Sequence, residues 1–331
     1  MSEALKSMGF AEEQAETLAR KSGRSLTILH RHAHKAGYRS PSWVERGVSL
    51  LPALLAGAWN TQHSGDREVI AELSGMRYDD YEEFLRTYRP LQDAPIDLRA
   101  GIWRLRAPVD AFVNLSHLIS RSHLESLAKA ATKVFSSDTP PDIAEEPFGR
   151  SSELYSPLLR EGIATSLLVV AAMHKEVGLE TGLDAEAFVN DLVAGLPGLR
   201  NDVRVILGLE QQLTYLMEAA PRPLLSALEF LLEGEDVASV LFAETSSFGG
   251  ARSRLPNLLW ALELQAWDPA YFRRVALLLA KLASMDPGGK SLNRPISSLR
   301  DLFTAWLPGT NAPFVERIAV LDEITALHPQ V

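Results

Sequence analysis

Residues 255–313 form a run of short apolar segments separated by proline and glycine, and this feature limits the fold more than any other. Two segments carry apolar residues at helical spacing: Leu258, Leu259, Leu262 and Ala266 in the first, and Val275, Leu278, Leu279 and Leu282 in the second. A short helix cannot bury so broad an apolar face alone, so it must stack on neighbouring helices. The pattern predicts an array of stacked helices.

Two small units are predicted to precede this array. Helices over residues 10–21 and 26–36, divided by Gly23 and a capping Ser25, form a helical hairpin. Helices over 50–59, 67–73 (opened by Asp66) and 79–88 then precede a two-stranded hairpin over 94–108, which alternates apolar and polar residues about Gly101. Three helices followed by a small hairpin is the order of a winged helix.

Further helices are predicted over residues 109–135, 158–177, 185–194, 203–219, 223–232 and 314–327, with loops over 136–156 and 242–254. The predicted fold is therefore mainly α: a helical hairpin (1–40), a winged-helix domain (41–115) and a solenoid-like α-helical repeat domain (116–331). The last helix carries Ile318, Leu321 and Ile324 on an apolar face, whereas a solenoid normally ends in a polar cap. We therefore expect the natural chain to extend beyond this sequence.

Composition excludes several classes of protein. The chain has no cysteine, so disulfides, thiol catalysis and cysteine-based metal sites are excluded. No apolar run approaches the roughly 18 residues of a membrane span, and the N-terminus lacks the apolar core of a signal peptide. We expect a cytoplasmic protein that does not bind membranes.

Charge argues against nucleic acid as the partner. The formal net charge is −9, and the predicted helix over 79–88, which would enter the DNA groove in a winged helix, carries Asp79, Asp80, Glu82 and Glu83 against Arg86 and Arg89. These carboxylates would be repelled by phosphates. Two basic groups leave DNA binding open as an alternative: Arg99, Arg104 and Arg106 on the wing, and Arg20, Lys21, Arg24, Arg31, Lys35 and Arg39 in the first hairpin.

Patterns typical of catalysis are not found. His30 and His34 share a helix face and His32 does not, and no carboxylate nearby completes a metal site. The string Gly288-Gly289-Lys290-Ser291 lacks the earlier glycine of a phosphate-binding loop, because Ser284 stands there, and it follows a helix rather than a strand. We predict a chain that is not an enzyme and that needs no cofactor.

Aromatic and basic residues in the 255–313 stretch are the predicted partner-binding residues. Aromatic side chains dominate the energetics of protein interfaces, although at helical spacing they also serve as core. Trp306 is an additional aromatic candidate in this stretch. Three arginines lie beside the aromatic residues, and they either contact a partner or bond to the carbonyls at helix ends: Arg273, Arg274 and Arg294. The predicted set is Trp260, Trp267, Tyr271, Arg273, Asn293 and Arg294.

Several strings resemble the helical-repeat region of large bacterial STAND-type P-loop NTPases. They are Leu258-Leu-Trp-Ala-Leu-Glu263, Ala266-Trp-Asp-Pro269, Asp286-Pro-Gly-Gly289, Asn293-Arg-Pro295, residues 232–242 and Glu218-Ala-Ala-Pro221. The string Ser22 to Leu29, with the winged helix after it, is similar to the segment that follows the NTPase core in such proteins. The likeness covers nearly the whole chain, which itself has no NTPase core.

The resemblance implies a function in recognition and relay. In that family the repeats act as a sensor, the winged helix relays binding to the nucleotide switch, and several members are implicated in defence against phage. The implied partners are a protein or other macromolecular trigger and the NTPase core of a longer parent chain, with a homo-oligomer left open. The alternative is a winged-helix DNA-binding regulator with a helical effector domain.

Overall fold

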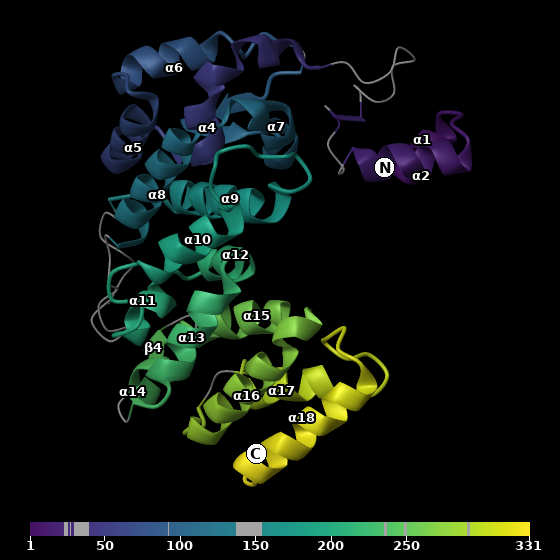
Figure 1. Ribbon diagram of the computed structural model, residues 1–331, viewed down its shortest axis with the longest axis vertical. Helices are drawn as coiled ribbons and strands as arrows, with labels where there is room; N and C mark the ends of the chain where they lie inside the picture. Colours follow the sequence, from purple (N-terminus) through teal and green to yellow (C-terminus); the bar gives the residue numbers. More distant parts are fainter. Residues whose placement is uncertain are drawn as a thin grey trace.

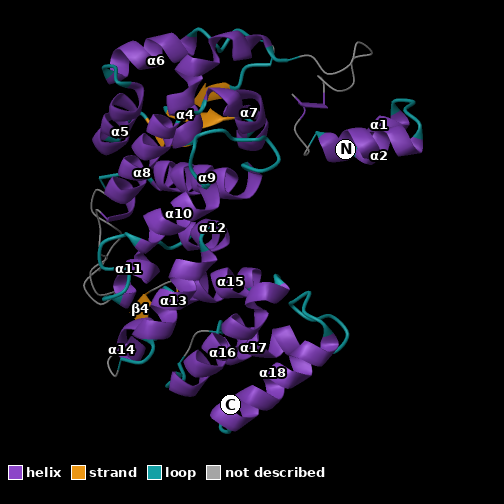
Figure 2. Ribbon diagram, viewed as in Figure 1, coloured by secondary structure: helices purple, strands orange, loops and turns teal. Residues whose placement is uncertain are grey.

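A computed structural model describes residues 1–22, 26, 28–29, 40–91, 93–136, 154–234, 237–247, 250–289 and 292–331. This part of the chain is mainly helical, as predicted, with a few short strands (Figure 2).

The N-terminal unit consists of two helices that pack on each other. α1 (Ser2–Ser7) and α2 (Glu12–Lys21) share a small core of Leu5, Ala15 and Leu18, separate from the main core. α2 lies where a helix was predicted, whereas α1 was not predicted. The predicted cap Ser25, the three histidines and Arg24, Arg31, Lys35 and Arg39 lie outside the described residues.

Helices and strands alternate in the next unit. The 3-10 helix η1 (Ser42–Leu50) and α4 (Leu51–Ala56) precede β1 (Ala58–Asn60), α5 (Ser64–Ser74), α6 (Tyr78–Arg86), β2 (Ile96–Arg99) and β3 (Ile102–Leu105). The predicted hairpin is confirmed as β2–β3, and β1 extends it to an antiparallel sheet of order β1-β3-β2. The predicted helix over 50–59 is wrong at its end, because Gly57 adopts φ 70° and Trp59 lies in β1 opposite Trp103.

Three other predicted segments are divided or altered. Residues 109–135 form α7 (Pro108–Leu115), η2 (Ser116–Leu118) and α8 (Arg121–Ser136) rather than one helix. Residues 203–219 are split into α11 (Val203–Gly208) and α12 (Gln212–Ala219), since Glu210 adopts φ 46°, which no helix interior allows. The predicted loop over 242–254 contains a hairpin, β4 (Thr245–Ser247) and β5 (Gly250–Arg252).

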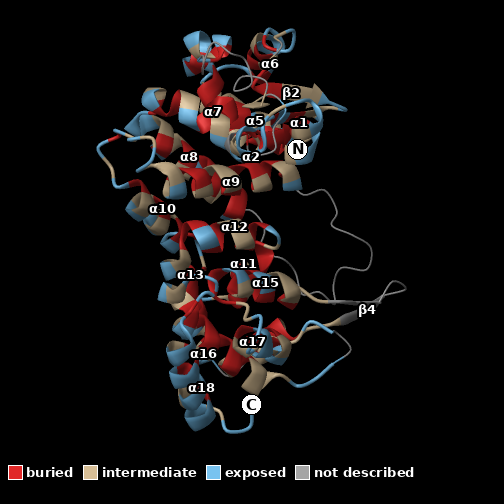
Figure 3. Ribbon diagram, turned by 90° about the vertical axis from the view of Figure 1, so that its right-hand side faces the viewer, coloured by how far each residue is buried: buried red, intermediate tan, exposed pale blue. Residues whose placement is uncertain are grey.

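The remaining helices stack in two columns along the long axis of the molecule (Figures 1 and 3). One column contains α9 (Pro157–Met173), α12, α15 (Leu255–Gln265) and α17 (Pro295–Phe303). The other contains α10 (Ala185–Ala194), α13 (Pro221–Leu231), α16 (Pro269–Met285) and α18 (Phe314–Leu327), while α14 (Val237–Leu241) packs on α11. The apolar residues predicted to face inward in α15 and α16 are buried.

The hydrophobic core is continuous from Trp43 to Ile324, and α9 joins the sheet-containing unit to the columns. Gly162 of α9 lies so close to the chain at Ala56 that a Cβ there would approach the Ala56 carbonyl oxygen to 2.1 Å. Glycine is therefore required at this contact, because any side chain would push α9 away from α4 and β1.

Candidate functional site

An apolar stripe on α15 and the turn that follows it is the strongest candidate for a recognition site. Trp260, Leu264 and Trp267 are 52%, 47% and 59% exposed. Trp260 and Leu264 lie one turn apart on α15, and Trp267 lies in the turn that follows the helix, where its amide donates to the Leu264 carbonyl at 3.2 Å. Solvent-facing helix surfaces are normally polar, so two exposed tryptophans with a leucine between them form a surface suited to an apolar partner.

Packing on the opposite face of α15 fixes the position of this stripe. Leu258, Leu259 and Leu262 are buried, and α15 packs on α12 and α16. The end of α15 is held by the loop before α18: the Thr310 hydroxyl donates to the carbonyl of Ala266 at 2.6 Å, and the Asn311 amide donates to that of Trp267 at 3.3 Å. The stripe is therefore presented on a firmly packed helix.

Two of the other predicted residues lie in contacts between helices of the second column. Tyr271 hydrogen-bonds the Arg222 side chain, and this bond acts to raise the pKa of that guanidinium. The Arg273 Nε donates to Glu323 of α18 at 2.9 Å. The neighbouring Arg274 pairs with Glu229 of α13 at 2.8 Å. These side chains join helices of this chain to one another.

The last two predicted residues precede α17. Arg294 is largely buried, donates to Asp286 at 2.7 Å, lies 3.4 Å from Glu244 and covers the Phe242 ring at 5.6 Å. Asn293 is exposed beside it. The structure therefore places only Trp260 and Trp267 of the predicted set on one exposed stripe, and the partner-binding role of every member stays a prediction. Leu264 was missed, although its spacing from both tryptophans is visible in the sequence.

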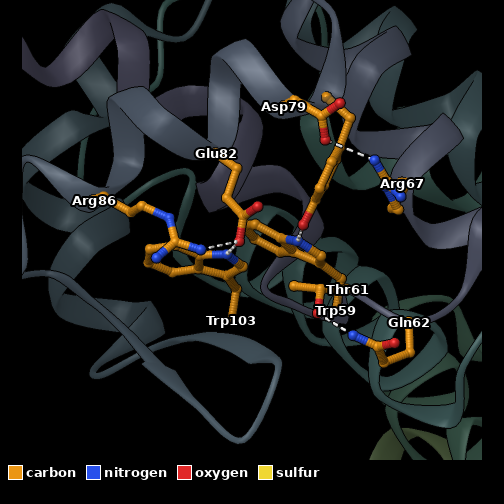
Figure 4. Close-up of polar contacts among 9 residues, drawn as sticks. Trp59, Thr61, Gln62, Arg67, Asp79, Glu82, Arg86 and Trp103 are labelled. Carbon is orange, nitrogen blue, oxygen red and sulfur yellow. Dashed lines mark hydrogen bonds and ion pairs between the residues drawn. The ribbon is translucent and has the colours of Figure 1, made fainter.

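Aromatic residues pair in the core of the sheet-containing unit (Figure 4). Trp59 and Trp103 stack with their ring centroids 6.1 Å apart. The indole of Trp59 donates to the Tyr78 hydroxyl at 3.3 Å, and that of Trp103 donates to the Glu82 carboxylate at 3.2 Å. Burial raises the pKa of Tyr78 to about 12. The indoles thereby fix α6 against the sheet.

The outer side of α6 remains acidic. Arg86 bonds to Glu82 at 3.1 Å and Arg67 of α5 bonds to Asp79 at 2.6 Å (Figure 4). Asp79 and Asp80 are exposed to solvent. The cationic groups nearest this face are therefore occupied by its own carboxylates, which disfavours insertion of α6 into a DNA groove.

Arginines gather on the outward face of the β2–β3 hairpin. Arg99, Arg104 and Arg106 line a groove of about 410 Å³ together with Asp97. Asp97 accepts from Arg99 at 2.6 Å and lies 3.8 Å from Arg106. The three arginines outnumber the single carboxylate on this face, so the wing predicted from the sequence presents a net positive surface.

Asp66 lies at the junction between the sheet-containing unit and α9. The predicted role of Asp66 in opening its helix is wrong, because α5 begins at Ser64 and the carboxylate points to other segments. It accepts from the amides of Asn60 and Ser156, each at 2.8 Å, and from the Ser156 hydroxyl at 2.5 Å. Burial raises the pKa of Asp66, although these hydrogen bonds act in the opposite direction. Ser156 also caps α9 by accepting from the Leu159 amide.

Within the described ranges, no group of three or more His, Asp or Glu residues is arranged to hold a metal ion. Over the same ranges, every helix is too short or too polar to cross a membrane. Gly288 and Gly289 lie in the loop two residues after helix α16 ends at Met285, whereas Lys290 and Ser291 lie outside the described residues. Comparisons with protein-family models, with curated proteins and with solved structures found no match to this chain.

Proposed function

We propose that this chain is the recognition and relay region of a STAND-like NTPase and that it senses a protein or other macromolecular trigger in the cytoplasm, in bacterial defence against phage. The observation that carries the proposal is the exposed stripe of Trp260 and Leu264 on α15 and Trp267 in the turn after it. Tryptophans that become buried when a complex forms are frequent hot spots of protein interfaces. In this proposal the chain itself performs no catalysis.

The fold supports the relay part of the proposal. The order helix, strand, two helices and two strands, with sheet order β1-β3-β2, fits a winged helix. The paired columns of helices fit a solenoid-like repeat array. α15 contacts α12, α12 contacts α9, and α9 contacts β1 and α4. A trigger bound at α15 would thus act on the winged helix through two packed helices, by shifting the population between two arrangements.

The first test measures the mass of the endogenous polypeptide that contains these peptides. We expect a mass well above 36.4 kDa and a phosphate-binding loop upstream of this region. An endogenous polypeptide of about 36.4 kDa, which leaves no room for an upstream NTPase core, would contradict the proposal.

A second test addresses the stripe itself, using the natural gene in cells challenged with phage. Replacing both Trp260 and Trp267 with Glu should abolish protection, because charged side chains cannot be desolvated in an apolar interface. Phe230→Glu is the matched control, since Phe230 is 63% exposed on α13. If the double variant protects as well as the control does, the stripe is not the recognition site.

The arginines on the wing favour a second candidate, a DNA-binding regulator with a helical effector domain. Contact between Arg99, Arg104 and Arg106 and phosphates would give an affinity for duplex DNA that falls steeply with salt, with a slope of about 0.9 per neutralised phosphate. A fluorescent duplex titrated at several salt concentrations measures that slope. Binding lost in Arg104→Ala would favour this candidate, whereas absence of binding at low salt would exclude it.

A further inference from the structure

The end of the helical columns carries an apolar surface that the rest of the chain leaves exposed. A groove of about 730 Å³ lies between α17 and α18 and is lined by Leu299, Phe303, Trp306, Leu321 and Ile324 among others. Trp306 is 87% exposed at its edge. Most of the Trp306 side chain is therefore exposed to solvent, although the groove beside it is lined mainly by apolar residues.

The apolar surface continues along the outer side of α18. Phe314 and Val315 are 62% and 79% exposed, and Ile318 is 42% exposed one turn further on. Because an aromatic side chain can bury about 150–250 Å², Trp306 and Phe314 together present on the order of 300 Å² of apolar surface. With the aliphatic residues, the patch approaches the ~800 Å² that each partner contributes to a standard stable interface.

Two unpaired charges of opposite sign flank this patch. Arg300 lies on α17 one turn after the exposed Ile296, and Asp322 lies on α18 one turn after Ile318. Within the described part of the chain, neither the Arg300 guanidinium nor the Asp322 carboxylate has an ion-pair partner. Each of the two helices thus carries an exposed apolar residue followed one turn later by an unpaired charge, which is positive on α17 and negative on α18.

We propose that this surface binds a second copy of the chain about a two-fold axis. A two-fold interface uses the same patch on both copies, so the patch must complement itself. In this arrangement Arg300 of each copy pairs with Asp322 of the other, and the apolar residues between them become buried. A patch that holds one cation and one anion satisfies this requirement, whereas a patch of one sign would repel its own copy.

The test is sedimentation equilibrium of the full chain over a range of micromolar concentrations. We expect a mass of about twice 36.4 kDa. Trp306→Glu should give a monomer, because it places a charge in the apolar patch that the second copy would bury. Phe230→Glu is the control and should leave the dimer intact, since Phe230 lies on α13 and does not line the groove between α17 and α18.

A charge exchange tests the orientation of the two copies. Arg300→Asp and Asp322→Arg should each weaken the dimer by about tenfold or more, and the chain that carries both substitutions should recover the original affinity. All four residues in these tests are exposed, so circular dichroism and thermal melting should be unchanged. A wild-type chain that stays monomeric, or a dimer that withstands Trp306→Glu, would overturn the proposal. If the losses of dimer affinity in the two single variants add in the double variant, the proposed pairing of Arg300 with Asp322 would be overturned.

Discussion

Removing the Asp66 side chain tests how α9 is attached to the sheet-containing unit. In Asp66→Ala the amides of Asn60 and Ser156 and the Ser156 hydroxyl lose their acceptor. Each buried donor left without a partner costs about 1–3 kcal/mol. Removal of the carboxylate also removes its own desolvation cost, which offsets part of the loss summed over the three donors. We expect the free energy of unfolding to fall by about 3 kcal/mol, a large share of the ~5–15 kcal/mol typical of a domain.

Urea unfolding followed by circular dichroism measures this loss. Ser156→Ala removes the hydroxyl bond to Asp66 and the cap on the Leu159 amide, so it should cost about 1–2 kcal/mol. Because the two residues share a hydrogen bond, the double variant should lose about 1 kcal/mol less than the sum of the single variants. Additive losses, or a loss below about 1 kcal/mol in Asp66→Ala, would refute the role assigned to this junction.

The pH dependence of stability gives an independent readout of Asp66. Its pKa is raised in the folded protein above the ordinary value of 3.8. As pH rises above 3.8, the unfolded chain loses the Asp66 proton while the folded protein still holds it. The free energy of unfolding therefore falls, and the stabilisation that is full below pH 3.8 is lost as pH passes the pKa of Asp66 in the folded protein. Asp66→Asn has no such proton and should lack this part of the slope. Identical pH profiles for the variant and the wild type would contradict the raised pKa.

Three further substitutions or titrations test other contacts. Arg160 is buried and donates to the carbonyls of Val134 at 3.1 Å and Gly208 at 2.9 Å, so Arg160→Met should destabilise the fold by about 3 kcal/mol in calorimetry. A change below about 1 kcal/mol would show that water replaces the guanidinium. Gly162→Ala should cost more than Gly309→Ala, because a Cβ on Gly309 would meet its nearest atom at 3.4 Å, an ordinary contact, and equal losses by urea unfolding would contradict the close contact with Ala56. The raised pKa of Tyr78, about 12, means that its contribution to stability is full below the ordinary value of 10.0 and is lost as pH rises toward 12. Tyrosinate absorbance during alkaline titration should therefore show Tyr78 ionising only as the protein unfolds, and its ionisation near pH 10 in the folded state would contradict the burial.

Helical periodicity predicted the core of α15 and α16 because the signal is local. Leu258, Leu262, Val275 and Leu279 recur at helical spacing, and all four are buried. The same signal could not tell which side of α15 faces solvent. Trp260 lies between the buried Leu259 and Ala261, and the helix is apolar nearly all round. Its exposure depends on where α12 and α16 pack, which the sequence does not encode locally.

Long-range partners explain the errors in the first half of the chain. The run from Leu50 to Trp59 is apolar and suits either a helix or a strand, and the choice is made by Trp103, which pairs with Trp59 from a distant strand. Asp66 resembles a helix cap until its partner Ser156 is known, and that residue lies 90 positions away. Local patterns predict elements, whereas these two contacts arise only when the chain has folded.

The proposed relay places a specific demand on α9. Close packing at Gly162 prevents α9 from sliding over Ala56, since even a Cβ has no space there. In the proposed relay, a trigger bound at α15 would therefore act on the sheet-containing unit by moving α9 as a body. A movement of α9 relative to α5 would separate Ser156 from Asp66, because Ser156 caps α9 and Asp66 belongs to α5. These hydrogen bonds are then the contacts that set the free-energy difference between the two arrangements, so weakening them should favour the triggered arrangement even without a trigger.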